Sequence, residues 1–159
     1  GSMAGRPMKI GSLFASILLK ANRADLLLFA GDAQWYAPDT GDSTLSLASR
    51  IESKAQWGGT DFHCIFDAAQ RAYERVIILS DMQGWIGYYC PRKAFDRYCQ
   101  RVGKRPRVFS FDLAGHGSLQ FPEKEVYCLA GWSDKSMETL GLLDGDKSAL
   151  IRKVDAVEI

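Results

Sequence analysis

The sequence predicts an α/β protein built on a doubly wound, mostly parallel sheet. Short unbroken apolar runs, such as residues 76–80, alternate with stretches whose apolar residues recur at three- and four-residue steps, such as residues 7–21. Strands that are apolar throughout are typical of parallel sheets that helices cover on both faces. Two runs at 26–29 and 34–37 are separated by a Gly-Asp turn and indicate one antiparallel edge strand.

Each helix and strand has its own signal in the sequence. Pro7 suits the first position of a helix, which is expected to end near residue 21. Ser43 is expected to cap a helix that runs to about residue 55, because serine side chains accept hydrogen bonds from the first helical amides. Pro91 is expected to open a helix that ends near residue 102. The other expected elements are a loop at 38–43, a helix through 62–73, strands at 76–80, 107–111 and 126–130, and helices near 133–142 and 145–153.

Composition predicts one soluble globular domain. The chain has 159 residues, 47% apolar and 25% charged, which is enough to bury a sizeable core. No apolar run approaches the about 20 residues that span a bilayer, and no secretion leader is recognisable, so we expect no membrane partner. The cysteines lack CxxC spacing, which argues against a zinc site and a disulfide-stapled secreted scaffold, and favours reduced thiols in the cytoplasm. They are Cys64, Cys90, Cys99 and Cys128.

Two oxygen-bearing residues mark the candidate ligand site. Thr60 lies in the glycine-rich turn Gly-Gly-Thr-Asp ahead of a helix, and Asp81 closes the apolar strand at 76–80. Loops at the carboxyl ends of parallel strands meet in one crevice, where ligands bind. A hydroxyl and a carboxylate there suit magnesium, which takes oxygen ligands. The alternative is that Thr60 or Asp61 merely caps a helix and Asp81 merely ends a strand.

In this order, these signals resemble a von Willebrand factor A domain, and more narrowly the C-terminal domain of the TROVE (Ro ribonucleoprotein autoantigen) family. The resemblance implies a Rossmann-like fold with a metal-dependent adhesion (MIDAS) site, in which Thr60 and Asp81 contribute to magnesium binding and an acidic side chain or phosphate completes the coordination. It also implies a partner ring of RNA-binding helical repeats and a part in small-RNA binding or RNA quality control. Further similar segments are 7–21, 29–32, 130–132 and 149–152.

The sequence departs from that family at its start. The family's Asp-x-Ser-x-Ser motif belongs at the end of a central strand just before the first helix, where this sequence begins with Gly-Ser-Met. One interpretation treats residues 1–3 as a cloning remnant and a start methionine ahead of a domain at 4–159. The other treats Ser2 as the last serine of the motif and a third metal ligand. Both remove the central first strand and the leading aspartate, so we expect weak magnesium binding or none.

A parallel sheet without its middle strand needs a replacement, because unpaired buried backbone groups are costly. One candidate is the terminal run 154–159, which could pair as a strand. The other candidate is exchange with a neighbouring chain. We therefore expect a strand-swapped dimer or a rearranged sheet.

A second candidate site is a basic helix face. Four basic residues after Pro91 recur at four- and three-residue steps and are expected on one face: Lys93, Arg97, Arg101 and Lys104. Neighbouring aromatic residues are Tyr88, Tyr89 and Tyr98. Cations beside aromatic rings suit phosphate contact and base stacking in single-stranded RNA. The alternative is an ordinary solvated helix face, since the net charge is only +1.

Other polar groups carry weaker signals. Ser110, Asp112 and His116 invite a hydrolase interpretation, but the segment has no GxSxG nucleophile elbow. His63 has no partner at zinc spacing, and the Asp-Gly-Asp at 144–146 lacks the rest of a calcium loop, so helix capping is favoured there. The sequence therefore predicts a binding module and not an enzyme. The main alternative is a protein–protein interaction domain of the same fold without an RNA role, and a hydrolase ranks third.

Overall fold

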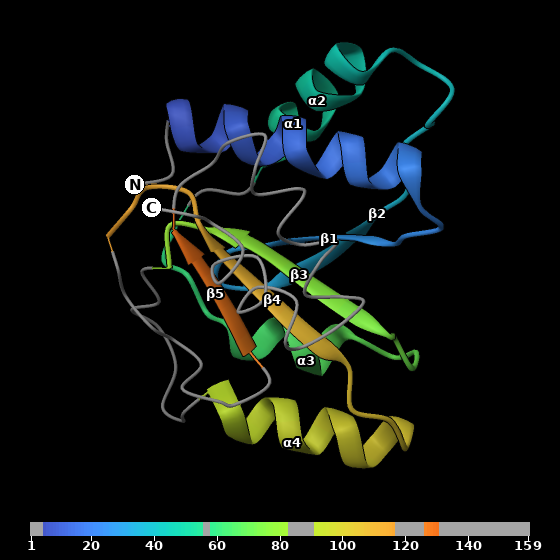
Figure 1. The fold of residues 1–159 in the computed structure, drawn as a ribbon, viewed down its shortest axis with the longest axis vertical. Helices are drawn as coiled ribbons and strands as arrows, with labels where there is room; N and C mark the ends of the chain where they lie inside the picture. The colour runs from blue at the N-terminus through green and yellow to red at the C-terminus, as the bar shows by residue number, and fades with distance from the viewer. Residues whose placement is uncertain (1–4, 56–57, 83–90, 117–125, 131–159) are drawn as a thin grey trace, which may run out of the picture.

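The computed structural model describes residues 5–55, 58–82, 91–116 and 126–130 (Figure 1), and it confirms the predicted α/β class. The elements in chain order are α1 (Arg6–Ala21), β1 (Leu26–Phe29), β2 (Ala33–Tyr36), α2 (Thr44–Ser53), α3 (His63–Ala68), β3 (Arg75–Ser80), α4 (Pro91–Val102), β4 (Arg107–Asp112) and β5 (Val126–Ala130). The helices predicted near 133–142 and 145–153, and the run 154–159, lie outside the described residues. None of the described helices is long and apolar enough to cross a membrane.

The described strands form two sheets. β1 and β2 pair antiparallel, from Leu26 opposite Tyr36 to Phe29 opposite Ala33. β3, β4 and β5 form a parallel sheet in that order. The hairpin and the parallel strands were both predicted, although β2 begins one residue earlier than expected.

Side chains of the two sheets pack in the same apolar clusters, although no described strand of one sheet is hydrogen-bonded to a strand of the other. On one face, Leu27 and Phe29 of β1 pack in the same cluster as Ile78 of β3. On the other face, Leu28 and Leu79 belong to one cluster with residues of α1 and α2. Yet β1 bonds only with β2, and β3 only with β4, among the strands that the structure describes. The sequence predicts that one central strand is missing without locating it, and the interruption between β1 and β3 is the place in the structure where such a strand would fit.

Burial differs between the strand that is paired on both sides and the two strands beside this gap. In β4, which lies between β3 and β5, every residue at 108–112 is buried. In β1, all four residues are apolar, as in a central strand, but each is only half-buried. In β3, Val76, Ile77 and Leu79 are also half-buried. The facing edges of β1 and β3 are therefore built like the interior of a sheet but are incompletely covered.

Helices cover both faces of the sheets (Figure 1). α1 and α2 pack on one face, where the Phe14 ring meets Phe111 edge-on at 5.0 Å between centroids. As predicted, Ser43 caps α2, since its side chain accepts a hydrogen bond from the Ser46 amide at 3.2 Å. α3 and α4 pack on the opposite face, where the centroids of Phe66 and Phe95 lie 5.0 Å apart.

The helix predicted through 62–73 is shorter in the structure, where α3 ends at Ala68. Side chains of α4 form hydrogen bonds with backbone groups that a longer α3 would pair within the helix itself. Arg101 donates to the carbonyl oxygens of Phe66 and Ala69, each at 2.7 Å. The Tyr98 hydroxyl donates to the Arg71 carbonyl at 2.9 Å and accepts from the Tyr73 amide at 3.2 Å. Tertiary hydrogen bonds therefore hold residues 69–74 in an extended path to β3.

Replacing Tyr98 with Phe tests this explanation. Tyr98 is fully buried, so the loss of its hydroxyl leaves one amide and one carbonyl without their partner. We expect the free energy of unfolding to fall by about 1–3 kcal/mol, measured by chemical denaturation. Tyr36→Phe, which removes a hydroxyl from a half-buried tyrosine of β2, is the control. Equal, negligible effects of the two substitutions would contradict the role given to Tyr98.

Candidate functional site

The carboxyl ends of β1, β3 and β4 lie at one edge of the sheets, and backbone hydrogen bonds connect their loops. The Asp61 amide, in the loop before α3, donates to the Ala30 carbonyl at the end of β1 at 2.8 Å. The Leu113 amide, after β4, donates to the Ser80 carbonyl at the end of β3, also at 2.8 Å. Residues distant in the sequence are thereby gathered along one rim.

Both residues of the predicted metal site stand on this rim. Thr60 is half-buried in the loop before α3, and Asp81 follows β3 with only 2% of its surface exposed. Their neighbours Phe62 and Met82 pack in the same apolar cluster, which draws the two loops toward one another. Ser2, the third predicted ligand, lies outside the described residues.

A strained turn fixes the position of Asp81. Met82 adopts a left-handed backbone with φ of 56°, a conformation that costs a non-glycine residue of order 1 kcal/mol. Its buried side chain holds the turn, because the Ser110 hydroxyl donates to the Met82 sulfur at 2.9 Å. The Ser80 hydroxyl accepts from the Met82 amide at 3.2 Å and donates to Asp81 Oδ1 at 3.4 Å. The carboxylate is thus held at the strand end and already has a hydrogen-bond donor.

Asp61 organises the first turn of α3. Its Oδ1 accepts from the His63 amide at 2.8 Å and contacts His63 Nδ1 at 2.6 Å. The N-cap of α3 is Phe62 and forms no side-chain capping bond, so Asp61 holds the first helical residue from one position before the cap. His63 Nε2 is buried and has no hydrogen-bond partner within the described parts of the chain.

Cys64, beside this pair, is an unreactive thiol. Its Sγ donates to the Asp61 carbonyl at 2.9 Å. Burial raises the pKa of Cys64 to about 12, and the negative charges of Asp61, Asp32 and Asp67 add to that increase. The raised pKa favours the protonated thiol, which is a poorer nucleophile than the thiolate.

These residues do not fit a tightly held magnesium ion. Thr60 and Asp81 offer oxygen atoms, which is the right chemistry for a hard cation, but only Asp81 brings charge. Across the described ranges, no group of three or more His, Cys, Asp or Glu side chains is arranged to hold a metal. Magnesium prefers six oxygen ligands and gives up its waters reluctantly, so this donor set is too small for tight binding.

Asp112 also belongs to this rim, although it was not predicted there. Like Asp81, it stands at the end of an apolar strand in the sequence. Both follow an apolar strand, and both are buried at the ends of adjacent strands, with Asp112 opposite Ser80. Asp112 Oδ1 accepts from the amides of Ala114 at 3.2 Å and Gly115 at 2.9 Å. These contacts hold its own turn, while His116, the third residue of the hydrolase hypothesis, is exposed.

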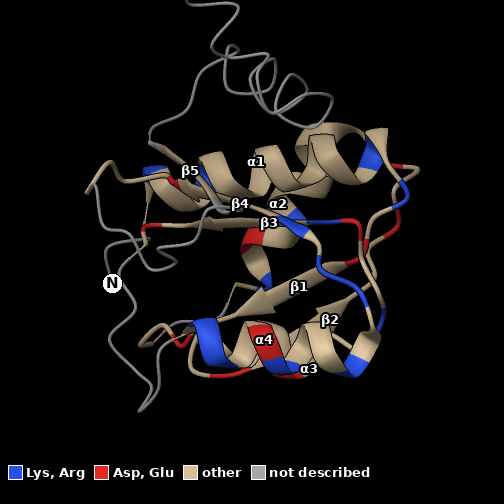
Figure 2. Ribbon diagram, turned by 60° about the horizontal axis from the view of Figure 1, so that its bottom comes forward, with Lys and Arg blue, Asp and Glu red and all other residues tan. Residues whose placement is uncertain are grey.

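The predicted basic stripe is only partly a free surface. Arg101 is used to hold residues of α3, as described above, and also lies 5.9 Å from the centre of the Tyr98 ring. Arg97 pairs with Asp67 at 3.3 Å. Lys104 pairs with Glu74 at 3.4 Å and lies beyond the helix, which ends at Val102, so its predicted place on the helix face was wrong. Figure 2 shows both acidic and basic bands along α4.

The aromatic residues predicted beside the basic stripe are not shown to be available for stacking on a base. Tyr98 is fully buried, where its ring packs on Phe66 and Phe95, so it cannot stack on a base. Tyr88 and Tyr89 lie outside the described residues. Lys93 is exposed on α4. All four cations of the stripe are exposed, but Arg101 is engaged by the Phe66 and Ala69 carbonyls, so Lys93, Arg97 and Lys104 are the better candidates for contact with a ligand.

Comparison with known proteins finds similarity in structure but not in sequence. No family model matches the sequence, and no curated protein sequence does. The Ro (RSR) protein of Deinococcus radiodurans has a similar solved structure, with a TM-score of 0.73 and 17% sequence identity over 87% of this chain. The chain spans only 29% of the length of that protein. At this identity the likeness concerns the fold, and it confirms the resemblance to a Ro-type fold that the sequence predicted.

Proposed function

We propose that this chain is the ligand-binding domain of a Ro-like RNA-binding protein and takes part in small-RNA binding or RNA quality control as a binding module, not as an enzyme. The observation that carries the proposal is the fold likeness to a Ro protein over 87% of the chain. The accessible cations on and after α4 add to it. A cytoplasmic location suits the free thiols of Cys64, Cys99 and Cys128.

The contacts of the basic residues support a division of their roles. The side chains of Arg97 and Asp67 are 54% and 51% exposed, and such surface pairs contribute only about 0–1 kcal/mol, so an RNA phosphate can replace Asp67. The same holds for Lys104 and Glu74, which are also at the surface. Arg101 differs, because two carbonyl oxygens of the α3 end depend on it. We therefore assign phosphate contact to Lys93, Arg97 and Lys104, and a structural role to Arg101.

Charge reversal on α4 tests the RNA role. We expect Lys93→Glu/Arg97→Glu to weaken the binding of a structured small RNA by at least about tenfold at low salt, and to flatten the dependence of affinity on salt concentration. Filter binding over a salt series measures both effects. The fold should remain intact, since both side chains are exposed.

Lys9→Glu/Lys54→Glu is the matched control. It makes the same change in net charge at exposed positions of α1 and the α2 C-cap, on the opposite face of the sheets. Equal RNA affinity of both double variants and the unmodified chain would refute the role of α4.

For the rim that bears Thr60 and Asp81, we propose weak magnesium binding or none in this chain. Titration calorimetry with magnesium should give heats no larger than those of Asp81→Asn, because a single charged ligand cannot offset the dehydration of the ion. Tight, stoichiometric binding that Asp81→Asn abolishes would contradict this. If the site holds metal in a longer protein, an acidic protein side chain or a phosphate is the proposed ligand that completes the coordination.

A second candidate function is protein–protein interaction without RNA, and the open edges of β1 and β3 favour it. Facing strand edges that are apolar and half-buried attract another strand. We propose that the run 154–159 fills the place between them by exchange in a strand-swapped dimer, and insertion within one chain is the alternative.

Light scattering combined with hydrogen exchange tests strand insertion. We expect a dimer whose β1 and β3 amides are protected about as well as those of β4, and we expect removal of residues 154–159 to abolish both the dimer and the protection of β1. A monomer with fast-exchanging β1 amides before and after truncation would exclude strand insertion by this segment.

A further inference from the structure

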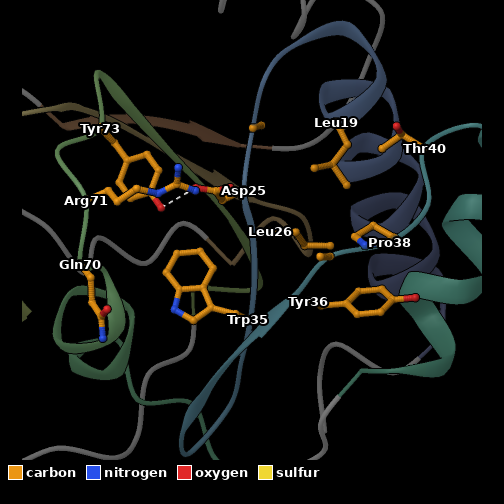
Figure 3. A pocket seen from close by; sticks show the side chains of 12 residues that line it. Leu19, Asp25, Leu26, Trp35, Tyr36, Pro38, Thr40, Gln70, Arg71 and Tyr73 are labelled. Atoms are coloured by element: carbon orange, nitrogen blue, oxygen red, sulfur yellow. Dashed lines mark hydrogen bonds and ion pairs between the residues drawn. The ribbon is translucent and has the colours of Figure 1, made fainter.

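A pocket of about 540 Å³ opens at the end of the sheets opposite the rim described above (Figure 3). Asp25 and Leu26 stand at the start of β1, while Arg71 and Tyr73 precede β3, so the pocket bridges the amino-terminal ends of the two unpaired strands. The C-terminal end of α1 and the segment after β2 close its other side. The lining residues are Leu19, Ala24, Asp25, Leu26, Trp35, Tyr36, Ala37, Pro38, Thr40, Gln70, Arg71 and Tyr73.

One wall of the pocket consists of planar groups. Trp35 is 43% exposed and, with Leu45, is one of two exposed large apolar residues within the described ranges. Its indole stacks on the Tyr73 ring with 6.5 Å between centroids and 29° between planes. The Arg71 guanidinium lies 6.0 Å from the centre of the Tyr73 ring. Figure 3 shows these three side chains and Gln70 along the same side of the pocket.

Asp25 holds this wall in place. Its Oδ2 accepts from the Tyr73 hydroxyl at 2.7 Å and forms an ion pair with Arg71. Burial, and then the hydrogen bond to Asp25, raise the pKa of Tyr73, so the phenol remains a donor at neutral pH. The Tyr73 ring and the Arg71 guanidinium are thereby oriented before any ligand arrives, which reduces the entropy cost of binding.

The charges of the pocket indicate the type of ligand. Asp25 and Arg71 are the only charged residues among those that line it, and they neutralise each other. The Asp25 carboxylate itself lines the pocket, so a phosphate group bound there would lie near a like charge. A flat, uncharged ring can instead stack on the Trp35 indole. The Gln70 amide, which also lines the pocket, provides both hydrogen-bond donors and an acceptor for the polar edge of such a ring. An exposed aromatic face beside fixed polar groups is the arrangement by which proteins bind unstacked bases of single-stranded RNA.

We propose that this pocket binds one unstacked nucleobase of single-stranded RNA, with the base on the Trp35 indole and its polar edge toward Gln70 and Arg71. The claim that this base belongs to RNA rests on the function proposed above. The segment that lines the pocket with Gln70, Arg71 and Tyr73 continues to Glu74, which pairs with Lys104. The pocket and the accessible cations near α4 are therefore joined by one short segment, so phosphates bound by the cations and a base in the pocket can belong to one strand.

The test uses nucleosides as well as RNA. Binding of adenosine and guanosine is followed by tryptophan fluorescence and NMR, and binding of an unstructured RNA of about eight nucleotides by filter retention. We expect Trp35→Ala to weaken both by about tenfold, because base–aromatic stacking contributes that much per base. Trp35→Phe should retain part of the affinity and keeps the test valid if the alanine variant does not fold.

Leu45→Ala is the matched control, since Leu45 is the other exposed large apolar residue and does not line the pocket. It should leave nucleoside and RNA binding unchanged.

Photocrosslinking of an RNA that contains 5-iodouridine should modify the peptide with Trp35 or that with Tyr73.

The outcomes separate this proposal from the function on which it rests. If Trp35→Ala binds RNA and nucleosides normally while Lys93→Glu/Arg97→Glu does not bind RNA, the pocket proposal fails and the RNA function stands. If nucleosides bind in a Trp35-dependent manner while charge reversal on α4 has no effect, the pocket stands and the role of α4 fails. No nucleoside binding, or Trp35-dependent binding of an oligosaccharide or a peptide in its place, overturns the pocket proposal.

Discussion

The packing of helices across two unpaired sheets is the constraint on which the rest of this structure depends. β1 and β3 have no hydrogen bonds to each other, yet their side chains enter the same apolar layers above and below. α1 bridges the two sheets on one face, since its residues contact Leu28 of β1 and Leu79 of β3 in one cluster. Side-chain burial, which is non-directional, can hold strands in place where the backbone ladder is interrupted.

The second constraint is the polar contact between α4 and the segment 69–74. Tyr98 and Arg101 supply hydrogen bonds that a longer α3 would have formed within its own backbone. This contact ends α3, directs the chain into β3, and positions Arg71 and Tyr73 beside Asp25. The hydrogen bonds between α4 and this segment thus shape the pocket. Arg101, which the sequence predicts to bind nucleic acid, contributes to these hydrogen bonds.

The two ends of the sheets have different chemistry. The carboxyl ends carry buried acids, Asp81 and Asp112, held by strained or hydrogen-bonded turns, together with the Asp61–His63 pair. The amino-terminal ends carry an aromatic wall fixed by one ion pair. The acids at the first end are engaged by their own turns, and we propose weak magnesium binding or none there and a flat neutral ring as the ligand of the second end.

The sequence by itself determined the fold class, most element boundaries and the cap of α2. Apolar periodicity located β1, α1 and α4 to within a residue, because burial of one helix face or of a whole strand leaves a direct trace in the pattern. The resemblance to a known domain also indicated that a central strand is missing, but only the structure shows that the interruption lies between β1 and β3. The sequence did not reveal that α3 ends at Ala68, or that Trp35 and Asp25 line a pocket with Arg71. Only the tertiary structure decided these, since each depends on hydrogen bonds, ion pairs and ring contacts between residues far apart in the chain, which no local pattern encodes.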